Sequence, residues 1–220
     1  MTEPTRIVLV WDFPTRLFHW ATVLLVMAAY FTWRLNWMGW HIRVGDGLLA
    51  LVLFRILWGF FGSSSARFLD FFVVPQMAAR HLVNSFRREA DQYAGHNPAG
   101  GWMVLFLLAL LLGESLTGLY VANDVANEGP LTEWVSAPVA NAITSLHAIL
   151  WDALLVAIVL HVLAIVAYAA IKGQNLLWPM ISGWKALPAS VPPPRMSGRA
   201  RAVILLGCSA LATALLARIL

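Results

Sequence analysis

Long apolar runs separated by short polar connections form the main pattern of this chain of 220 residues. Four runs are long enough to cross a bilayer as helices, because a hydrocarbon core of about 30 Å requires roughly 20 apolar residues. These runs cover about residues 17–33, 42–61, 102–122 and 146–171, and a shorter run at about 202–217 predicts a fifth crossing. The pattern predicts an all-α integral membrane protein, a four-helix bundle with a fifth, C-terminal transmembrane helix.

Composition excludes several other classes of protein. Hydrophobic residues make up 60% of the chain and charged residues 12%, whereas soluble domains are roughly 45–50% apolar and about 25% charged. The 15 Lys and Arg residues are spread thinly between apolar runs, which argues against disorder and against nucleic-acid binding. Cys208 stands alone, so a multi-cysteine metal site and covalent c-type haem are excluded, and any haem would be bound non-covalently.

The distribution of Lys and Arg predicts the orientation, because cytoplasmic connections carry an excess of these residues. Two basic residues, Arg34 and Arg43, fall on one side. Eleven fall on the other: Arg6, Arg16, Arg67, Arg80, Arg87, Arg88, Lys172, Lys185, Arg195, Arg199 and Arg201. We therefore expect a multi-pass protein of the bacterial inner (plasma) membrane with a cytoplasmic N-terminus, and with the 123–145 connection outside.

Three connecting segments complete the predicted organisation. The N-terminal run has no small-residue cleavage site after it and is interpreted as a retained span. Residues 75–91 have the pattern of an amphipathic helix lying on the inner leaflet. Residues 186–201 form a Pro/Arg-rich linker, which separates the fifth span from a transmembrane domain at 1–185.

Four of the six histidines fall at two matching depths of the predicted bundle. His147 and His161 are 14 residues apart on the fourth span, which places them on one helix face with roughly 21 Å between them along the axis. His41 begins the second span at the depth of His147, and His19 begins the first span at the depth of His161. Two imidazoles from different helices at each level can ligate one b haem on both faces of the porphyrin.

Other interpretations of these histidines remain open. An intramembrane histidine can be an interhelical hydrogen-bonding group, and a haem-free membrane anchor or transporter would need no ligands. His81, in the 75–91 segment, and His96, at the entry to the third span, have no partner at their predicted depth and are interpreted as structural. The pairwise match of the other four favours two haems.

Three arginines are candidates for the haem propionates. Arg55 lies 14 residues after His41, and hence on the same helix face near the depth of His19. It could instead extend its side chain to the inner surface, since a charged side chain within a span is costly unless it reaches water or an anion. Arg16 is a second candidate at the inner level, and Arg43 is one at the outer level.

Glu114, about two thirds of the way along the third span, is the most deeply placed acid. A carboxyl group at that depth must be neutral, paired or in contact with water. We consider two roles for it: a relay for a proton coupled to quinone chemistry, or a protonated group hydrogen-bonded to a neighbouring helix.

Several segments around these residues resemble the bacterial cytochrome b561 family, which includes the membrane cytochrome b subunits of nickel–iron hydrogenases. The resemblance covers about residues 8–185. It is carried by VWDFPTRLFHW ending at Trp20, WHIRVGDGLLALVLFRILWG ending at Gly59, GHNPAGGWM starting at Gly95, and LHAILWDALLVAIVLH ending at His161.

The resemblance implies a four-helix bundle that holds two haem b groups, with His19, His41, His147 and His161 as the iron ligands. It also implies electron transfer, as in a respiratory chain, between quinone or quinol and a partner such as a periplasmic c-type cytochrome or a hydrogenase-like redox subunit. Some small members instead oxidise superoxide and reduce ubiquinone. The chain is accordingly an electron-transfer subunit or a quinone-linked oxidoreductase, and its long 63–100 connection and fifth span favour a partnered carrier.

Overall fold

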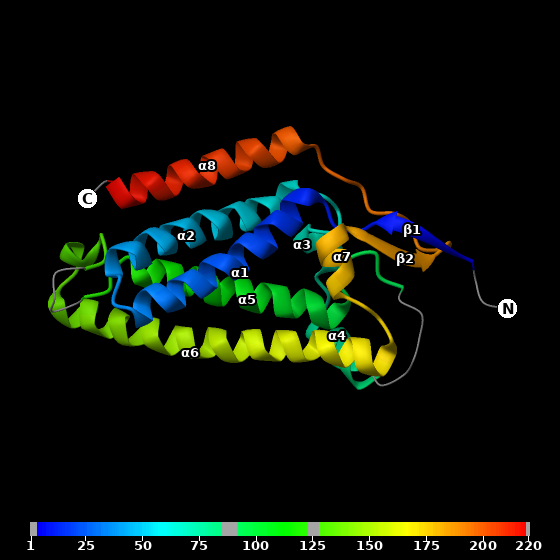
Figure 1. The fold of residues 1–220 in the computed structure, drawn as a ribbon, viewed down its shortest axis with the longest axis horizontal. Coiled ribbons are helices and arrows are strands. Elements are labelled where there is room, and N and C mark those ends of the chain that lie inside the picture. The colour runs from blue at the N-terminus through cyan, green and yellow to red at the C-terminus, as the bar shows by residue number, and fades with distance from the viewer. Residues whose placement is uncertain (1–3, 85–91, 123–127, 219–220) are drawn as a thin grey trace. The chain divides into compact units, whose positions relative to one another are not determined.

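A computed structural model describes residues 4–84, 92–122 and 128–218 of the chain (Figure 1). Helices account for most of the described residues. In chain order the elements are β1 (Thr5–Leu9), α1 (Phe13–Arg34), α2 (Met38–Phe61), α3 (Phe68–Phe71), α4 (Pro75–Asn84), α5 (Pro98–Gly118), a 3-10 turn (Thr132–Trp134), α6 (Ala137–Ala167), a π-helical turn (Tyr168–Lys172), α7 (Leu177–Ser182), β2 (Trp184–Pro188) and α8 (Arg199–Arg218).

The chain divides into two compact units. Unit 1 contains Met1–Leu17, Ile56–Phe106 and Ile158–Ala202, and therefore both strands and the short helices α3, α4 and α7. Unit 2 contains Phe18–Arg55, Leu107–Ala157 and Val203–Leu220. Each of the five long helices contributes residues to both units.

The protein is an all-α membrane helical bundle, as the apolar runs predict. Four helical segments in the described part of the chain are long and apolar enough to cross a membrane: Met38–Phe61, Pro98–Gly118, Ala137–Lys172 and Arg199–Ala217. The last of them corresponds to the predicted fifth run. The 22-residue helix α1 is not among the four, because Arg16, His19 and several threonines lower its mean hydropathy, so the crossing at 17–33 stays a prediction.

Helices α5 and α6 begin before the apolar runs, and a capping residue marks the start of α5. Helix α5 begins at Pro98, four residues before the predicted span, and Asn97 Oδ1 accepts a hydrogen bond of 2.7 Å from the Gly100 amide. Such a cap satisfies an N–H group that has no partner within the helix. Helix α6 begins at Ala137, nine residues before the predicted run.

A two-stranded antiparallel sheet in unit 1 was not predicted. Strand β1 pairs with β2 in a register that places Thr5 opposite Pro188 and Leu9 opposite Trp184, and α7 contacts β2 (Figure 1). Backbone hydrogen bonds from Val10 and Trp11 to the Gly183 carbonyl continue the connection toward α1. The segment before α1 is thereby attached to the segment that follows α6.

Asp12 fixes the start of α1. Its Oδ1 atom accepts a hydrogen bond of 2.7 Å from the Thr15 amide, and its Oδ2 atom accepts one of 3.2 Å from the Trp58 indole N–H. Asp12 is 5% exposed and Trp58 is fully buried. One carboxylate therefore caps α1 and satisfies a buried donor on α2.

The segments predicted as a linker and a surface helix have the following structure in the described residues. Within residues 186–201, the strand β2 continues to Pro188, and Arg195 and Ser197 donate backbone hydrogen bonds to the Ser64 and Ser63 hydroxyls. The segment is thus attached along the chain that follows α2. Helix α4 covers Pro75–Asn84, and the remainder of the predicted 75–91 helix lies outside the described residues.

The two histidines interpreted as structural lie in unit 1 and have side-chain neighbours. His81 Nε2 is 2.9 Å from the Tyr168 hydroxyl, which also accepts a hydrogen bond of 3.0 Å from Asn97 Nδ2. The His96 ring lies 4.7 Å from Trp11 and 4.8 Å from Phe71, measured between ring centroids.

Candidate functional site

A cavity of about 410 Å³ lies in unit 2 among residues of α1, α2, α5 and α6. We call it the His41–His147 cavity, after two of the histidines that line it. Its walls are mainly apolar and aromatic, and Trp33, Tyr30 and Trp151 contribute large rings. A cavity of this volume and lining is typical of small-molecule and cofactor sites, which measure about 300–1,000 Å³.

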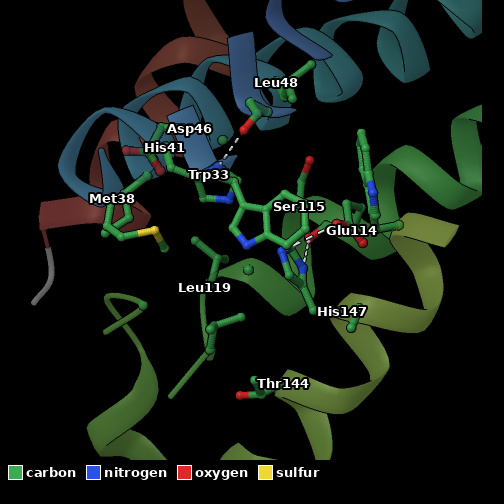
Figure 2. A pocket seen from close by; sticks show the side chains of 18 of the residues that line it. Trp33, Met38, His41, Asp46, Leu48, Glu114, Ser115, Leu119, Thr144 and His147 are labelled. Atoms are coloured by element: carbon green, nitrogen blue, oxygen red, sulfur yellow. Dashed lines mark hydrogen bonds and ion pairs between the residues drawn. The ribbon is translucent and has the colours of Figure 1, made fainter. Parts of the chain in front are cut away.

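His41 and His147 reach the cavity from opposite sides. Figure 2 shows His41 with Trp33 and Asp46 on the side of α1 and α2, and His147 with Glu114 on the side of α5 and α6. Both imidazoles are half-buried. The structure therefore brings together, across one cavity, the two histidines that the sequence assigns to one level.

The Nδ1 atom of His41 lies 3.0 Å from the backbone carbonyl oxygen of Ala29 on α1. A carbonyl oxygen can only accept a hydrogen bond, so Nδ1 carries the proton in this contact. The lone pair of the neutral ring is then on Nε2, the atom that remains for a metal ion. Histidines that ligate metals usually have this arrangement, with the other ring N–H donated to a carbonyl or a carboxylate.

His147 shares the Nδ1 contact of this arrangement on the other side of the cavity, but its Nε2 atom has a carboxyl neighbour. Its Nδ1 atom lies 3.1 Å from the backbone carbonyl oxygen of Glu114 and 3.0 Å from the Thr117 hydroxyl, both on α5. A Cβ atom at Gly118 would lie 3.3 Å from His147 Cε1, so that glycine allows the ring to approach α5 closely. The Nε2 atom lies 3.3 Å from the Glu114 carboxyl oxygen Oε1 (dashed in Figure 2).

The donor set fits a b haem. Two imidazoles line one mainly apolar cavity from opposite sides, and the Nδ1 contact of each ring leaves Nε2 as the atom that could ligate iron. Ligation on both faces of a porphyrin requires two such rings. Gly45 lines the same cavity, and a Cβ atom there would meet nothing within 4 Å. The chain therefore leaves open space one turn after His41, where a flat macrocycle can approach the backbone.

Acidic side chains also line the cavity. Glu114, Asp46 and Asp152 all contribute to its wall. The Glu114 side chain is 15% exposed, and its Oε1 atom lies 3.3 Å from His147 Nε2 on the neighbouring helix α6. Its suggested role as a proton relay stays a prediction.

The three candidate arginines are in different surroundings. Arg55 is 2% exposed, which does not fit a side chain that extends to the surface. Arg43 is exposed, its guanidinium lies 5.1 Å from the centroid of the Trp40 ring, and it does not line the cavity. Arg16 donates a hydrogen bond of 2.6 Å to the Ile181 carbonyl of α7. Their roles toward propionates stay predictions.

The second pair of histidines is divided between the units. His19 and Arg55 belong to unit 2, whereas His161 and Arg16 belong to unit 1. The His19 ring lies 4.9 Å from the Trp20 ring, edge to face. Ligation of a second haem by His19 and His161 therefore rests on their spacing in the sequence and stays a prediction.

Sequence reasoning missed the groups that orient the two imidazoles. The acceptors for Nδ1 are backbone carbonyls, which every residue has and no residue type reveals. Thr117 was also missed, although its position three residues after Glu114 on the same helix could have suggested a contact. The stacked rings of Tyr30 and Trp151, 5.9 Å apart, were not predicted as a wall of the cavity either.

Comparison with known proteins shows the family to which this arrangement belongs. The profile of the family described as prokaryotic cytochrome b561 matches residues 10–183, which include all four candidate ligands. The chain belongs to this family. Membership implies a membrane cytochrome that carries haem b and takes part in electron transport. No solved structure matches the chain significantly.

Curated relatives of this cytochrome carry a more specific name. A protein of Rhizobium leguminosarum bv. viciae named "Probable Ni/Fe-hydrogenase B-type cytochrome subunit" is 26% identical over 211 residues, covering 80% of this chain and 87% of the relative. A protein of the same name from Rhodobacter capsulatus is 26% identical over 212 residues, covering 80% of each chain. A third, from Bradyrhizobium diazoefficiens, is 25% identical over 212 residues, covering 80% of this chain and 85% of the relative.

Proposed function

We propose that this cytochrome transfers electrons across the bacterial inner membrane through two bis-histidine b haems, between the quinone pool and a partner redox protein. The observation that carries the proposal is the pair of imidazoles at the His41–His147 cavity. Each donates Nδ1–H to a backbone carbonyl of a neighbouring helix, so the lone pair of each neutral ring is on Nε2. The Nε2 atom of His147 contacts the Glu114 carboxyl at 3.3 Å, and a bound haem iron would replace this contact. A haem bound there supplies a one-electron carrier that is reduced and oxidised at its iron.

The residues of the chain have separate tasks in this scheme. His41 and His147 hold one haem. The apolar and aromatic wall of the cavity excludes water from it, and this burial is one of the factors that set the haem's reduction potential. His19 and His161 hold the second haem, toward the cytoplasm. Moving one electron charge across the membrane changes the free energy by about 2.3 kcal/mol per 100 mV, so the membrane potential favours one direction of transfer.

Three residues complete the scheme. Glu114, in contact with His147, relays a proton coupled to quinone chemistry. Arg55, buried in unit 2, and Arg16 provide positive charge for the propionates of the second haem.

The partner in this proposal is a hydrogenase or a similar redox subunit on the outer side of the membrane. The names of the three relatives support this choice over a periplasmic c-type cytochrome. Glu128 and Glu133, both exposed, belong to the connection that we place outside. Acidic residues in this position favour a partner with a basic contact surface.

Haem content tests the proposal directly. In purified protein we expect the reduced-minus-oxidised spectrum of a b-type cytochrome and two haems per chain. His41→Ala and His147→Ala should each lose the same haem, and His19→Ala and His161→Ala should each lose the other. A colourless wild-type protein, or any of these four variants that retains both haems, would contradict the scheme.

Two electron donors then distinguish the functions. A quinol added to purified protein should reduce the haems, as expected of a carrier linked to the quinone pool. Rapid reduction by superoxide without a partner, followed by reduction of ubiquinone, would favour the alternative function, a stand-alone superoxide:ubiquinone oxidoreductase.

A further inference from the structure

Two threonines have the same relation to the two histidines of the His41–His147 cavity. On α1, the carbonyl oxygen of Ala29 accepts the hydrogen bond from His41 Nδ1 at 3.0 Å. Three residues later, the Thr32 hydroxyl donates to the same carbonyl at 3.1 Å and to the Ala28 carbonyl at 2.7 Å. One carbonyl oxygen thus connects the histidine of α2 with a threonine of α1.

Helix α5 repeats this arrangement. The carbonyl oxygen of Glu114 lies 3.1 Å from His147 Nδ1. Three residues later, the Thr117 hydroxyl donates to the same carbonyl at 3.0 Å and to the Gly113 carbonyl at 2.7 Å. The two helices come from distant parts of the chain, yet each presents a carbonyl followed by a threonine to an imidazole of the same cavity.

Thr117 has one contact more than Thr32. Its Oγ1 atom lies 3.0 Å from His147 Nδ1 as well. Because its hydroxyl proton is directed to the helix carbonyls, the oxygen can only accept toward the imidazole. His147 Nδ1 is therefore held as a donor by two acceptors, the Glu114 carbonyl and the Thr117 hydroxyl.

The hydroxyls influence the carbonyls through the helix backbone. A threonine that bonds back to carbonyls three and four residues earlier often bends its helix slightly. Such a bend turns a carbonyl away from the helix axis, so that its second lone pair becomes available to a neighbouring side chain. Thr32 and Thr117 make such back-bonds to the Ala29 and Glu114 carbonyls, the same two carbonyls that contact the histidines.

We propose that Thr32 and Thr117 are a matched pair of positioning residues, which hold His41 and His147 in the Nδ1–H form and keep both Nε2 atoms directed to a single haem iron. This inference rests on the proposed function. It assigns a role to two residues that the sequence did not single out.

The pair has a consequence for the haem potential. An acceptor at Nδ1–H raises the basicity of a ligating imidazole, and a more basic ligand stabilises ferric over ferrous iron. Removing the Thr117 hydroxyl takes one acceptor from His147 Nδ1–H, and removing the Thr32 hydroxyl takes away the back-bond that holds the Ala29 carbonyl toward His41. Each change weakens the hydrogen bond at Nδ1–H and raises the midpoint potential of the haem held by His41 and His147. We expect a larger effect at Thr117, which contacts the imidazole directly.

Redox titration of the full-length, haem-loaded protein tests the proposal. Thr32→Val and Thr117→Val keep nearly the same side-chain shape and remove the hydroxyl. At the wild-type midpoint, we expect the ferrous-to-ferric ratio to rise several-fold, up to about tenfold for Thr117→Val, and tenfold corresponds to about 59 mV for one electron. Of the two midpoints in the titration, both variants must shift the same one, since both threonines act on the same haem.

Two sets of variants serve as controls. Thr32→Ser and Thr117→Ser restore a hydroxyl and should return the midpoint close to that of the wild type. Thr213→Val removes a buried hydroxyl on α8, from a residue that is 4% exposed and does not line the cavity. It should leave both midpoints unchanged.

The outcomes separate this inference from the proposed function. Loaded valine variants with unchanged midpoints, shifts in different haem components, or serine variants that behave like valine would each overturn the role of the threonines. Should one valine variant fail to bind haem, the other still carries the test. A wild-type protein that contains no haem would overturn the proposed function, and this inference with it.

Discussion

At the scale of single residues, Gly45 offers the simplest way to ask whether the His41–His147 cavity holds a haem. It lines the cavity one turn after His41, and open space surrounds the position that a Cβ atom would take. A leucine at this position would clash with no protein atom near its Cβ and would project into the cavity. It would also favour the helix by about 0.5–1 kcal/mol, since glycine is a poor helix former.

We therefore expect Gly45→Leu to give a folded protein with about one haem per chain, half of the proposed content. Haem-to-protein stoichiometry from the reduced absorbance spectrum measures this. Gly39→Leu is the matched control, because Gly39 lies on the same helix, also has open space at its Cβ position and does not line the cavity. Retention of two haems in Gly45→Leu would contradict the assignment of the cavity.

The candidate ligands could be predicted from the sequence, but their hydrogen-bond partners could not. The distance between His147 and His161 along a helix follows from the rise per residue alone. The pairing of His41 with His147 followed from the expected direction of each span. Whether Nδ1 or Nε2 faces the cavity depends on where neighbouring backbone carbonyls lie, and only packing decides that.

At the scale of elements, the start of α1 depends on a single buried carboxylate. Asp12→Ala removes an N-cap, which costs about 0.5–2 kcal/mol, and leaves the buried indole N–H of Trp58 without its acceptor, which costs about 1–3 kcal/mol. We expect destabilisation of about 2–4 kcal/mol and a clearly lower apparent melting temperature in detergent. Asp12→Asn should fall between this variant and the wild type, because the amide oxygen still caps the helix.

Asp70→Ala is the control for this change. Asp70 pairs with Arg67 at 2.8 Å, and both side chains are 40% exposed. An exposed pair of this kind contributes about 0–1 kcal/mol, because water and salt screen it. Equal loss of stability in the Asp12 and Asp70 variants would show that the contacts of Asp12 do not fix the start of α1.

The long helices of this cytochrome could be predicted from the sequence, because a helix that crosses a bilayer needs a long apolar run. The two-stranded sheet could not be predicted in this way. Strand β1 lies before α1 and β2 follows α7, so their pairing joins segments that are more than 170 residues apart. Local patterns do not specify such a partner. The apolar runs also did not predict the helix ends, because a cap such as Asn97 lets a helix begin in polar sequence before the apolar run.

At the scale of the whole molecule, the strand pair constrains the path of the chain through the membrane. Thr5 pairs opposite Pro188, and the Ala189 amide donates to the Pro4 carbonyl at 3.0 Å. Residues that are hydrogen-bonded in this way lie on the same side of a bilayer. The chain must therefore cross an even number of times between them. Helices α2, α5 and α6 are long and apolar enough to supply three crossings, and α1 is the remaining long helix in that interval.

We accordingly expect α1 to cross the membrane, although its composition alone does not identify it as a span. Single cysteines in a Cys208→Ser background test this in intact cells with a membrane-impermeant thiol reagent. Thr5→Cys and Ala189→Cys should react only after the membrane is permeabilised, whereas Leu35→Cys and Glu133→Cys should react from outside; all four residues are exposed. Reaction of Thr5→Cys and Leu35→Cys from the same side would show that α1 does not cross. Another helix would then have to make the crossing count between the two strands even.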